Sequence, residues 1–408
     1  MPGFTTQIIH SDRQEPIEHG SLHKPIHANV AFGFDDVQDL VDVFQAKQKG
    51  YAYSRQVNPT VTALESKITK MERGIDTVCF ATGMAAIGSA LFALLRKGDH
   101  VVSSSFLFGN TDSLFKSFST IGIDLTFVDA TDVSNVESAI QENTRLVFVE
   151  TIANPRTQVS DLDQIGKLCA ARGLVYVVDN TMTSPFLYQP IDSNASLVVN
   201  SLTKYISGHG HALGGAITET GNFDWVGFPN IYDEYKKDNS NRWGLTQIRK
   251  KGLRDFGATL TPEAAFHIAT GSETLALRMQ RQCTTAQRLA DFLHAHPRVV
   301  RVYYPGLSDH PEHERAKLRF SKPGALLSFE LVDEIDPFQL LNRLKLVISS
   351  TNLGDNRTLA IPVAHTIYHE MGAERRASMG IADSLIRVSV GIEDCDDLIE
   401  DFDVALKT

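Results

Sequence analysis

Short apolar runs alternate with helix-like segments over residues 62–200. Residues 62–74 (TALESKITKMERG) have a helical period and end at a glycine, a short apolar run follows at 77–81, and 83–99 is helical again. Further buried strands are predicted at 100–104, 124–129, 146–151, 174–179 and 196–200, with a helix at 161–172. This alternation predicts an α/β fold, with a mainly parallel sheet that helices cover on both faces.

The remaining segments have different patterns. Residues 1–60 lack a sustained period and are rich in polar residues, which predicts an irregular arm that lies against another surface. Residues 219–260 are polar and weakly periodic, which indicates an insertion. A helix is predicted over 262–296, followed by strands at 299–304, 325–331, 346–350 and 385–390. We therefore expect the arm, an α/β domain over 61–262 that contains the insertion, and a smaller C-terminal α+β domain over 263–408.

Composition narrows the classes of function. The 408 residues suggest two to three domains, and the formal net charge of −10 gives no basic surface for nucleic acid or an anionic membrane. The N-terminus has no basic stretch followed by an apolar run, and no window approaches the roughly 18 apolar residues of a membrane span. We expect a cytoplasmic protein whose partner is a small molecule, with no nucleic acid and no membrane involved.

The four cysteines are far apart in the sequence. Cys79, Cys169, Cys283 and Cys395 show no paired spacing, which predicts reduced thiols and argues against a zinc cluster or a disulfide scaffold. His209 and His211 form a His-x-His pair, but no third ligand stands at a recognisable spacing. We therefore predict no metal site.

Two predicted strand ends carry residues of chemical interest. The run VYVVDN places Asp179 at the end of one strand, and LVVNSLTK places Lys204 just beyond the end of another. Each residue alone would be interpreted as a helix cap or a solvated surface charge. Because the carboxyl ends of strands border the ligand crevice in open α/β sheets, however, both side chains can face one site.

A phosphate site is predicted beside this pair. The segment ATGMAA at 81–86 joins a strand to a helix through a small turn, whose backbone N–H groups can hold a phosphate that Gly83 allows to approach closely. Ser201 and Thr203 add hydroxyl donors next to Lys204. A carboxylate, an amine and a phosphate cradle together suit pyridoxal phosphate, with Lys204 bonded to the cofactor as a Schiff base and Asp179 keeping its pyridine nitrogen protonated.

Several motifs give the chain a strong resemblance to a family of pyridoxal-phosphate enzymes that includes cystathionine γ-synthases, O-acylhomoserine sulfhydrylases and methionine γ-lyases. They are YSRQVNPT at 53–60, ATGMAA at 81–86, ETIANP at 150–155, VVDNT at 177–181, NSLTKYISGHG at 200–210, GSETLALR at 271–278 and RVSVGIED at 387–394. The resemblance covers nearly the whole chain. It implies a PLP-dependent transferase of the aspartate-aminotransferase-like fold (fold type I), with a mainly parallel sheet domain and a smaller C-terminal α+β domain.

The resemblance also implies roles for individual residues. Met84 would join Gly83, Ser201 and Thr203 in binding the phosphate, and Asn154 would lie near the hydroxyl of the cofactor ring. Beyond the cofactor, Arg387 would hold the α-carboxylate of the substrate as a bidentate fork, with Asn352 close to the same carboxylate.

The arm is implied to cross to a neighbouring subunit. There Tyr53 and Arg55 would bind the phosphate of the partner's cofactor, so that dimers share their active sites and pair into a homotetramer. Without the resemblance, Arg55 would be interpreted as part of a surface salt bridge. With it, we expect Lys204, Asp179 and Tyr53 to be the catalytic residues.

One departure from the family pattern bears on the reaction. Phe108 stands where many members have a tyrosine stacked on the cofactor, so a ring is present without its hydroxyl. A thiol, with a pKa near ~8.5, leaves less readily than a carboxylate, whose acid has a pKa near ~4, and so depends more on a proton donor. The sequence therefore favours γ-replacement on an O-acetyl- or O-succinylhomoserine by sulfide, a thiol or cysteine, giving homocysteine, methionine or cystathionine.

The sequence supports three other functions less well. A carbon–sulfur γ-lyase acting on methionine or cystathionine, which would make 2-oxobutanoate, ammonia and a thiol, is the runner-up. A catalytically silent protein that binds the cofactor is disfavoured, because both Lys204 and Arg387 are present. A dinucleotide-binding protein is disfavoured further, because no G-x-G-x-x-G turn follows a strand.

Overall fold

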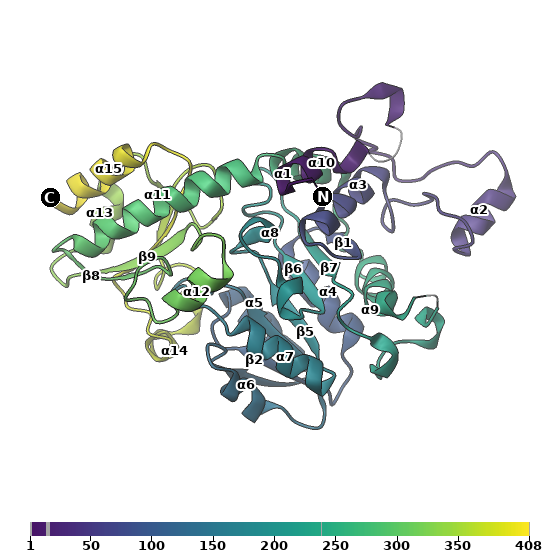
Figure 1. Cartoon of the computed structure of the whole chain (residues 1–408), viewed down its shortest axis with the longest axis horizontal. Helices are drawn as coiled ribbons and strands as arrows, with labels where there is room; N and C mark the ends of the chain where they lie inside the picture. Colours follow the sequence, from purple (N-terminus) through teal and green to yellow (C-terminus); the bar gives the residue numbers. More distant parts are fainter. Residues whose placement is uncertain (1, 14–16, 238, 408) are drawn as a thin grey trace.

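The computed structural model describes residues 2–13, 17–237 and 239–407, and two β-sheets organise them (Figure 1). The strands of the larger sheet are β1 (Asp76–Phe80), β2 (His100–Ser104), β3 (Asp124–Val128), β4 (Thr144–Glu150), β5 (Val175–Asp179), β6 (Leu197–Asn200) and β7 (Gly215–Glu219). The helices around it are α3 (Pro59–Met71), α4 (Gly83–Leu94), α5 (Gly109–Ser119), α6 (Val133–Ala139), α7 (Leu162–Arg172), α8 (Ser184–Leu187), α9 (Trp243–Gln247) and α10 (Pro262–Ser272).

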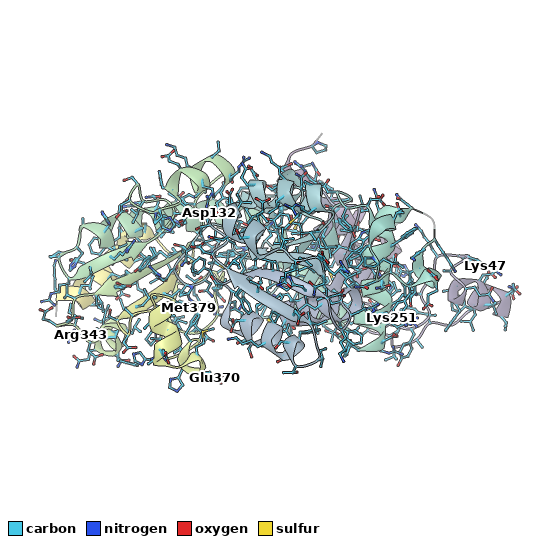
Figure 2. All side chains as sticks on the ribbon, turned by 90° about the horizontal axis from the view of Figure 1, so that it is seen from below. Lys47, Asp132, Lys251, Arg343, Glu370 and Met379 are labelled. Carbon is cyan, nitrogen blue, oxygen red and sulfur yellow. The ribbon has the colours of Figure 1, made fainter. Side chains whose placement is uncertain are left out.

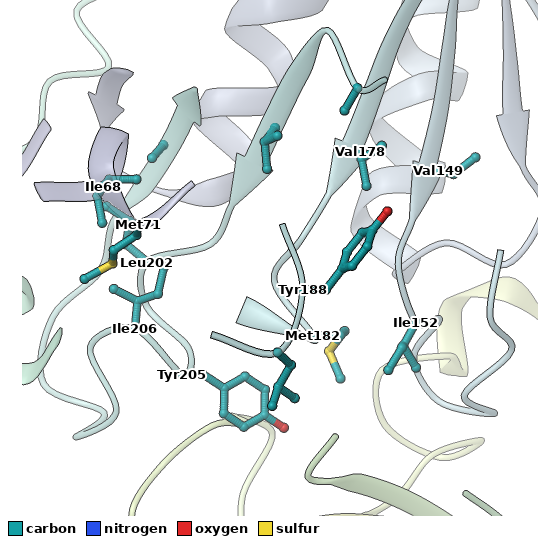
Figure 3. Close-up of a cluster of buried hydrophobic side chains, with 14 of the residues drawn as sticks. Ile68, Met71, Val149, Ile152, Val178, Met182, Tyr188, Leu202, Tyr205 and Ile206 are labelled. Atoms are coloured by element: carbon teal, nitrogen blue, oxygen red, sulfur yellow. The ribbon is translucent and has the colours of Figure 1, made fainter. Parts of the chain in front are cut away.

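The larger sheet has the strand order β1-β7-β6-β5-β4-β2-β3 and is parallel except for β7, which runs antiparallel to both of its neighbours. Successive strand residues point to opposite faces, so Val177 and Val178 belong to two different buried clusters. The cluster that contains Val178 also includes Ile68 of α3 and Leu202 (Figure 3). The predicted mainly parallel α/β sheet is confirmed.

The smaller sheet lies at the C-terminal end and has the order β10-β11-β12-β9-β8. Its strands are β8 (Val299–Tyr303), β9 (Leu326–Leu331), β10 (Ile348–Ser349), β11 (Leu359–Pro362) and β12 (Leu385–Ser389). Its helices are α11 (Leu275–Ala295), α12 (His313–Arg319), α13 (Pro337–Arg343), α14 (Ala373–Ser378) and α15 (Cys395–Lys407). Phe329 and Phe402 pack edge to face in its core, with ring centroids 6.1 Å apart.

The helix predicted over 262–296 is in fact two helices, α10 and α11. The break falls after Gly271, where a side chain would come within 2.1 Å of the carbonyl oxygen of Ser207. Arg278 donates to the Gly271 carbonyl at 2.8 Å and also to the carbonyls of Tyr205 and Ile206. The chain therefore bends where it packs against the segment after Lys204. The short strands β7 and β11 were not predicted at all.

The arm carries two short helices, α1 (Phe4–Ile9) and α2 (Val37–Phe44), within otherwise irregular chain. Helix α2 has no buried residue and lies away from the rest of the molecule (Figure 1). In the perpendicular view, Lys47 marks this end of the elongated molecule and Arg343 the opposite end (Figure 2). The described part of the arm thus contains an amphipathic helix with no covering surface in this subunit.

The segment expected to be an insertion, 219–260, covers one face of the larger sheet. Trp225 is fully buried there, and its indole N–H donates to Glu219 Oε2 at 3.0 Å. A π-helical turn, Ile248–Asp255, packs on α4, where Ser89 Oγ donates to the Gly252 carbonyl at 3.1 Å. All four cysteines are buried free thiols, as predicted. Among the described residues, no helix is long and apolar enough to cross a membrane.

Candidate active site

A cavity of about 820 Å³ opens at the carboxyl ends of the parallel strands and is bordered on its other side by the C-terminal part of the chain. It brings together ten of the residues that the sequence singled out: Gly83, Met84, Phe108, Asn154, Asp179, Ser201, Thr203, Lys204, Asn352 and Arg387. Its position agrees with the rule that ligands bind at strand carboxyl ends in open α/β sheets.

The turn before α4 has the geometry expected of an anion site. Thr82 caps the helix by accepting a hydrogen bond from Ala85 N at 3.0 Å. A Cβ on Gly83 would lie 2.9 Å from Ser201 Cβ, so glycine allows the turn to lie directly against the segment after β6. The free N–H groups of this helix start and the hydroxyls of Ser201 and Thr203 border the same cavity.

Lys204 lines the cavity, and its Nζ donates to Asn352 Oδ1 at 2.7 Å. Burial, followed by the nearby charge of Arg387, lowers the pKa of the Lys204 amine to about 8. A larger fraction of this amine is therefore neutral near pH 7 than for a solvated lysine. A neutral amine can form a covalent bond to a carbonyl carbon or accept a proton.

Arg387 is a buried cation on β12, only 1% exposed. Its Nη2 donates to the carbonyl oxygens of Thr351 and Asn352, at 3.0 and 2.9 Å, and its Nε has no partner among the residues that the structure describes. Burial lowers the pKa of this guanidinium to about 10. A buried cation whose described hydrogen-bond partners are neutral carbonyls favours an anionic ligand at the same wall of the cavity.

Asp179 and Glu150 end the neighbouring strands β5 and β4 and pair with each other in the sheet register. Burial raises the pKa of Asp179, against the hydrogen bond that its Oδ1 accepts from Thr181 N at 2.9 Å. Burial and the charge of Asp179 raise the pKa of Glu150 well above its usual range. A cationic ring nitrogen beside Asp179 would stabilise its ionised form.

Glu150 was missed in the sequence, although it opens the ETIANP motif. Its Oε1 accepts a hydrogen bond from Phe108 N at 2.8 Å, so the carboxyl holds the segment that presents Phe108 to the cavity. The signal was available, because Glu150 follows an apolar strand just as Asp179 does. Asn154, four residues later, is buried, and its Oδ1 has no partner among the described residues.

Tyr53 and Arg55 do not line this cavity in their own subunit. Tyr53 is 39% exposed, and the Arg55 guanidinium lies over its ring, 5.3 Å from the centroid. Arg55 also donates to the backbone carbonyl of Arg254. Within one chain, therefore, neither residue lies in the cavity that Lys204 lines. This arrangement is compatible with the expectation that the arm acts on a neighbouring subunit.

The histidines near the cavity do not form a recognisable metal site. His211 lines the cavity, and its ring packs edge to face on His209 and His267, with centroids 5.3 and 5.0 Å away. Within the described ranges, the acidic and histidine side chains close enough to share an ion are those of Asp12, His23 and Glu273, and Lys67 already donates to Glu273 at 3.1 Å.

The residues around the cavity fit the pyridoxal phosphate predicted from the sequence. A helix start with adjacent hydroxyls suits a phosphate, an amine of lowered pKa suits the aldehyde, and a carboxylate suits the ring nitrogen. The unpartnered Oδ1 of buried Asn154 leaves room for one more polar contact with a ligand. The buried guanidinium of Arg387 lines the same cavity and can accommodate an anionic group.

Comparison with known proteins agrees with this fit. The family model described as "Cys/Met metabolism PLP-dependent enzyme" matches residues 5–407. An L-methionine gamma-lyase of Fusobacterium nucleatum subsp. polymorphum is 37% identical over 99% of this chain and 98% of its own length. A homocysteine synthase of Schizosaccharomyces pombe is 36% identical over the same shares of the two chains.

Solved structures have the same fold. A putative O-acetylhomoserine (thiol)-lyase from Campylobacter jejuni superimposes with a TM-score of 0.94 at 31% identity, covers 100% of both chains and carries N'-pyridoxyl-lysine-5'-monophosphate. A cystathionine gamma-lyase from Lactobacillus plantarum superimposes with a TM-score of 0.89 at 30% identity, over 100% of this chain and 99% of that one. The predicted fold type I and the pyridoxal phosphate cofactor are confirmed. This chain belongs to the family of pyridoxal-phosphate-dependent enzymes of cysteine and methionine metabolism.

Proposed function

We propose that this enzyme catalyses γ-replacement, in which a sulfur nucleophile displaces the acyl group of an O-acylhomoserine. The observation that carries the choice is Phe108, whose ring borders the cavity where a phenol would supply a proton to a departing thiol. An acyloxy group departs as a carboxylate and needs that proton less. Sulfide as the nucleophile gives homocysteine, a thiol gives methionine or a homologue, and cysteine gives cystathionine.

Three residues of this chain handle the substrate in this proposal. Arg387 binds the α-carboxylate through its fork, which fixes the direction of the Cα–H bond. Lys204 removes the Cα proton and then moves a proton at Cβ, for which an amine with a pKa of about 8 is suited near neutral pH. Asn352, which accepts from Lys204 Nζ at 2.7 Å and from Arg387 through its carbonyl, keeps the two side chains in register.

The remaining residues orient the cofactor. Pyridoxal phosphate, when bound, supplies an electron sink for the bonds broken at Cα and Cγ of the substrate. Asp179 would pair with its ring nitrogen, Asn154 would accept or donate near its hydroxyl, and Phe108 would cover its ring. Gly83, Met84, Ser201 and Thr203 surround its phosphate. In the overall reaction, the S–H bond of the nucleophile and the Cγ–O bond of the substrate break. The S–Cγ bond forms, and the acyloxy group leaves with the proton as a carboxylic acid.

The arm completes the site of a second subunit in this proposal. Tyr53 and Arg55 contribute to the partner's phosphate site, and Tyr53 is placed to exchange a proton there. The support is that both residues lie outside their own cavity, while the arm before them is poorly covered. We propose a homotetramer built from such dimers.

Product analysis with and without sulfide tests the reaction. We expect O-acetyl- or O-succinylhomoserine with sulfide to give homocysteine and the free acid as main products. Without a nucleophile, turnover should fall by about tenfold or more, because addition to Cγ is then missing. Methionine alone should be a poor substrate. If the fastest reaction is instead the release of 2-oxobutanoate and ammonia from methionine, the enzyme is a γ-lyase. Relatives with both activities have similar identity to this chain and do not decide between them.

Substitution of Phe108 by tyrosine should change the balance between the two reactions. A phenol at this place adds a proton donor, so we expect Phe108→Tyr to raise γ-elimination from methionine by roughly 10²-fold while replacement on an O-acylhomoserine changes little. Phe106→Tyr is the matched control, because Phe106 lies on the same segment but does not line the cavity. An unchanged ratio of the two activities in Phe108→Tyr would remove the reason for preferring replacement.

A further inference from the structure

The strand ends that line the cavity have a second, hidden face. Glu150, Asp179 and Ser201 border the cavity at the ends of β4, β5 and β6. Because successive residues of a strand point to opposite faces, their neighbours Thr151, Asn180 and Asn200 point away from it. All three neighbours are fully buried, with 0% exposure, and all three are polar. Polar side chains at such positions require partners, which identifies a buried network behind the cofactor site.

Glu72 is the centre of this network. It directly follows α3, is 0% exposed, and accepts two hydrogen bonds at the same oxygen, Oε1. The donors are the side-chain amides of Asn180 and Asn200, at 2.9 and 2.6 Å. One carboxyl group therefore joins Asn180, which follows Asp179 at the end of β5, to Asn200, which precedes Ser201 at the end of β6.

The network continues to the third strand end. Thr183 Oγ1 donates to Asn180 Oδ1 and is also hydrogen-bonded to Thr151 Oγ1 at 3.0 Å. Asn180 Nδ2 donates in addition to the Tyr188 carbonyl at 3.0 Å. Contacts that start at Glu72 thus connect the ends of β4, β5 and β6 across the face opposite to the cavity.

Burial and hydrogen bonding have opposite effects on the charge of Glu72. Its Oε2 and the Oδ1 of Asn200 have no partner among the described residues. Burial raises the pKa of Glu72 to about 7, although both amide hydrogen bonds lower it. A protonated carboxyl can donate as well as accept, which suits a cluster of amides and hydroxyls better than an isolated buried charge does.

We propose that Glu72 is a positioning residue for the cofactor. By holding Asn180 and Asn200 on one oxygen, it sets the separation between Asp179, which faces the ring nitrogen, and Ser201, which faces the phosphate. The inference rests on the proposed roles of those two residues, but not on which reaction the enzyme catalyses. Glu72 acts through its neighbours and does not touch the substrate.

Substitutions at Glu72 test this inference through cofactor binding. Glu72→Ala removes the acceptor of the buried Asn200 amide and leaves the Asn180 amide with the Tyr188 carbonyl alone. We therefore expect the dissociation constant of pyridoxal phosphate, from spectral titration of the apoprotein, to rise about 10- to 100-fold. The circular dichroism of the bound cofactor should change with it, because the ring is held less firmly. Glu72→Gln keeps a neutral acceptor and adds a donor, so its constant should stay within about threefold of the wild type.

Glu219 provides a matched control in the same sheet. It is also a fully buried carboxyl, one of whose oxygens has no hydrogen-bond partner among the described residues, while the other accepts from Trp225. It pairs with Leu197, at the end of β6 opposite to Asn200, and so lies far from the strand ends that line the cavity. Glu219→Ala should lower the thermal unfolding temperature, as Glu72→Ala does, and leave cofactor binding within about threefold of the wild type.

A milder variant covers the case in which Glu72→Ala does not fold. Thr183→Val keeps the side-chain shape and removes the hydroxyl that joins Asn180 to Thr151, so we expect the cofactor constant to rise about three- to tenfold. Two outcomes would overturn the inference. In the first, cofactor binding and circular dichroism are unchanged in both Thr183→Val and Glu72→Ala. In the second, they are unchanged in Thr183→Val and Glu72→Ala does not fold. Methionine lysis by a wild-type enzyme that binds the cofactor would overturn the proposed reaction alone.

Discussion

Replacement of Lys204 by alanine is expected to abolish turnover, with kcat reduced by roughly 10⁴-fold. In the proposed reaction, this residue supplies both the covalent attachment of the cofactor and the base at Cα. Proton transfer by a placed base alone contributes about 10²–10⁴-fold. The phosphate cradle and Asp179 remain intact in Lys204→Ala, so pyridoxal phosphate should still bind, without a covalent bond.

Borohydride reduction checks the same residue chemically. In the wild type, reduction should bleach the visible band and leave the mass of the cofactor on the peptide that contains Lys204. Lys67→Met is the matched control, because Lys67 is also buried, at 1% exposure, but pairs with Glu273 outside the cavity. Near-normal activity in Lys204→Ala, or a cofactor fixed to another lysine, would contradict the proposed mechanism.

Mixing two inactive variants is expected to restore activity if subunits share their sites. Lys204→Ala lacks the lysine but has an intact arm, whereas the double variant Tyr53→Ala and Arg55→Ala has the lysine but no functional arm. Loss of the Arg55 contact with a phosphate should weaken cofactor binding by about tenfold or more, because hydrogen bonds to charged groups are worth about 1.5–3 kcal/mol. In a mixed dimer, one of the two sites then contains both an intact Lys204 and an intact arm.

The measurement is the activity of the two chains produced together, compared with each chain alone at the same total concentration. We expect the mixture to be clearly more active than either chain alone when pyridoxal phosphate is kept low enough to leave the arm variant largely without cofactor, because a minority of the sites in a random mixture are then intact. Wild-type enzyme taken through the same procedure controls for losses on reassembly. A mixture no more active than its components would show that Tyr53 and Arg55 do not complete the partner's site, and the exposed arm would then need another explanation.

The residues proposed to hold the cofactor could be predicted from the sequence, because they stand directly after apolar runs that predict strands. Apolar runs located β5 and β6, and the residues at their ends, Asp179 and Lys204, border one cavity. The small turn at Gly83 was recognised in the same way, since a strand followed by a helix start predicts an anion site. The proposed substrate-binding residue, Arg387, could be predicted only from the family resemblance, because it lies on the other sheet.

The amino-acid sequence by itself determined most of the strands and helices of the larger sheet domain, the strand-end chemistry and the cofactor class, because hydrophobic period and turn residues act over a few positions. Only the tertiary structure decided that Glu150 pairs with Asp179, that Asn352 joins Lys204 to Arg387, and that Glu72 connects Asn180 with Asn200. It also decided that the helix after residue 262 breaks after Ser272, where Gly271 packs against Ser207. Such contacts join residues far apart along the chain, and their burial and hydrogen bonds depend on strand order and register, which no local pattern contains.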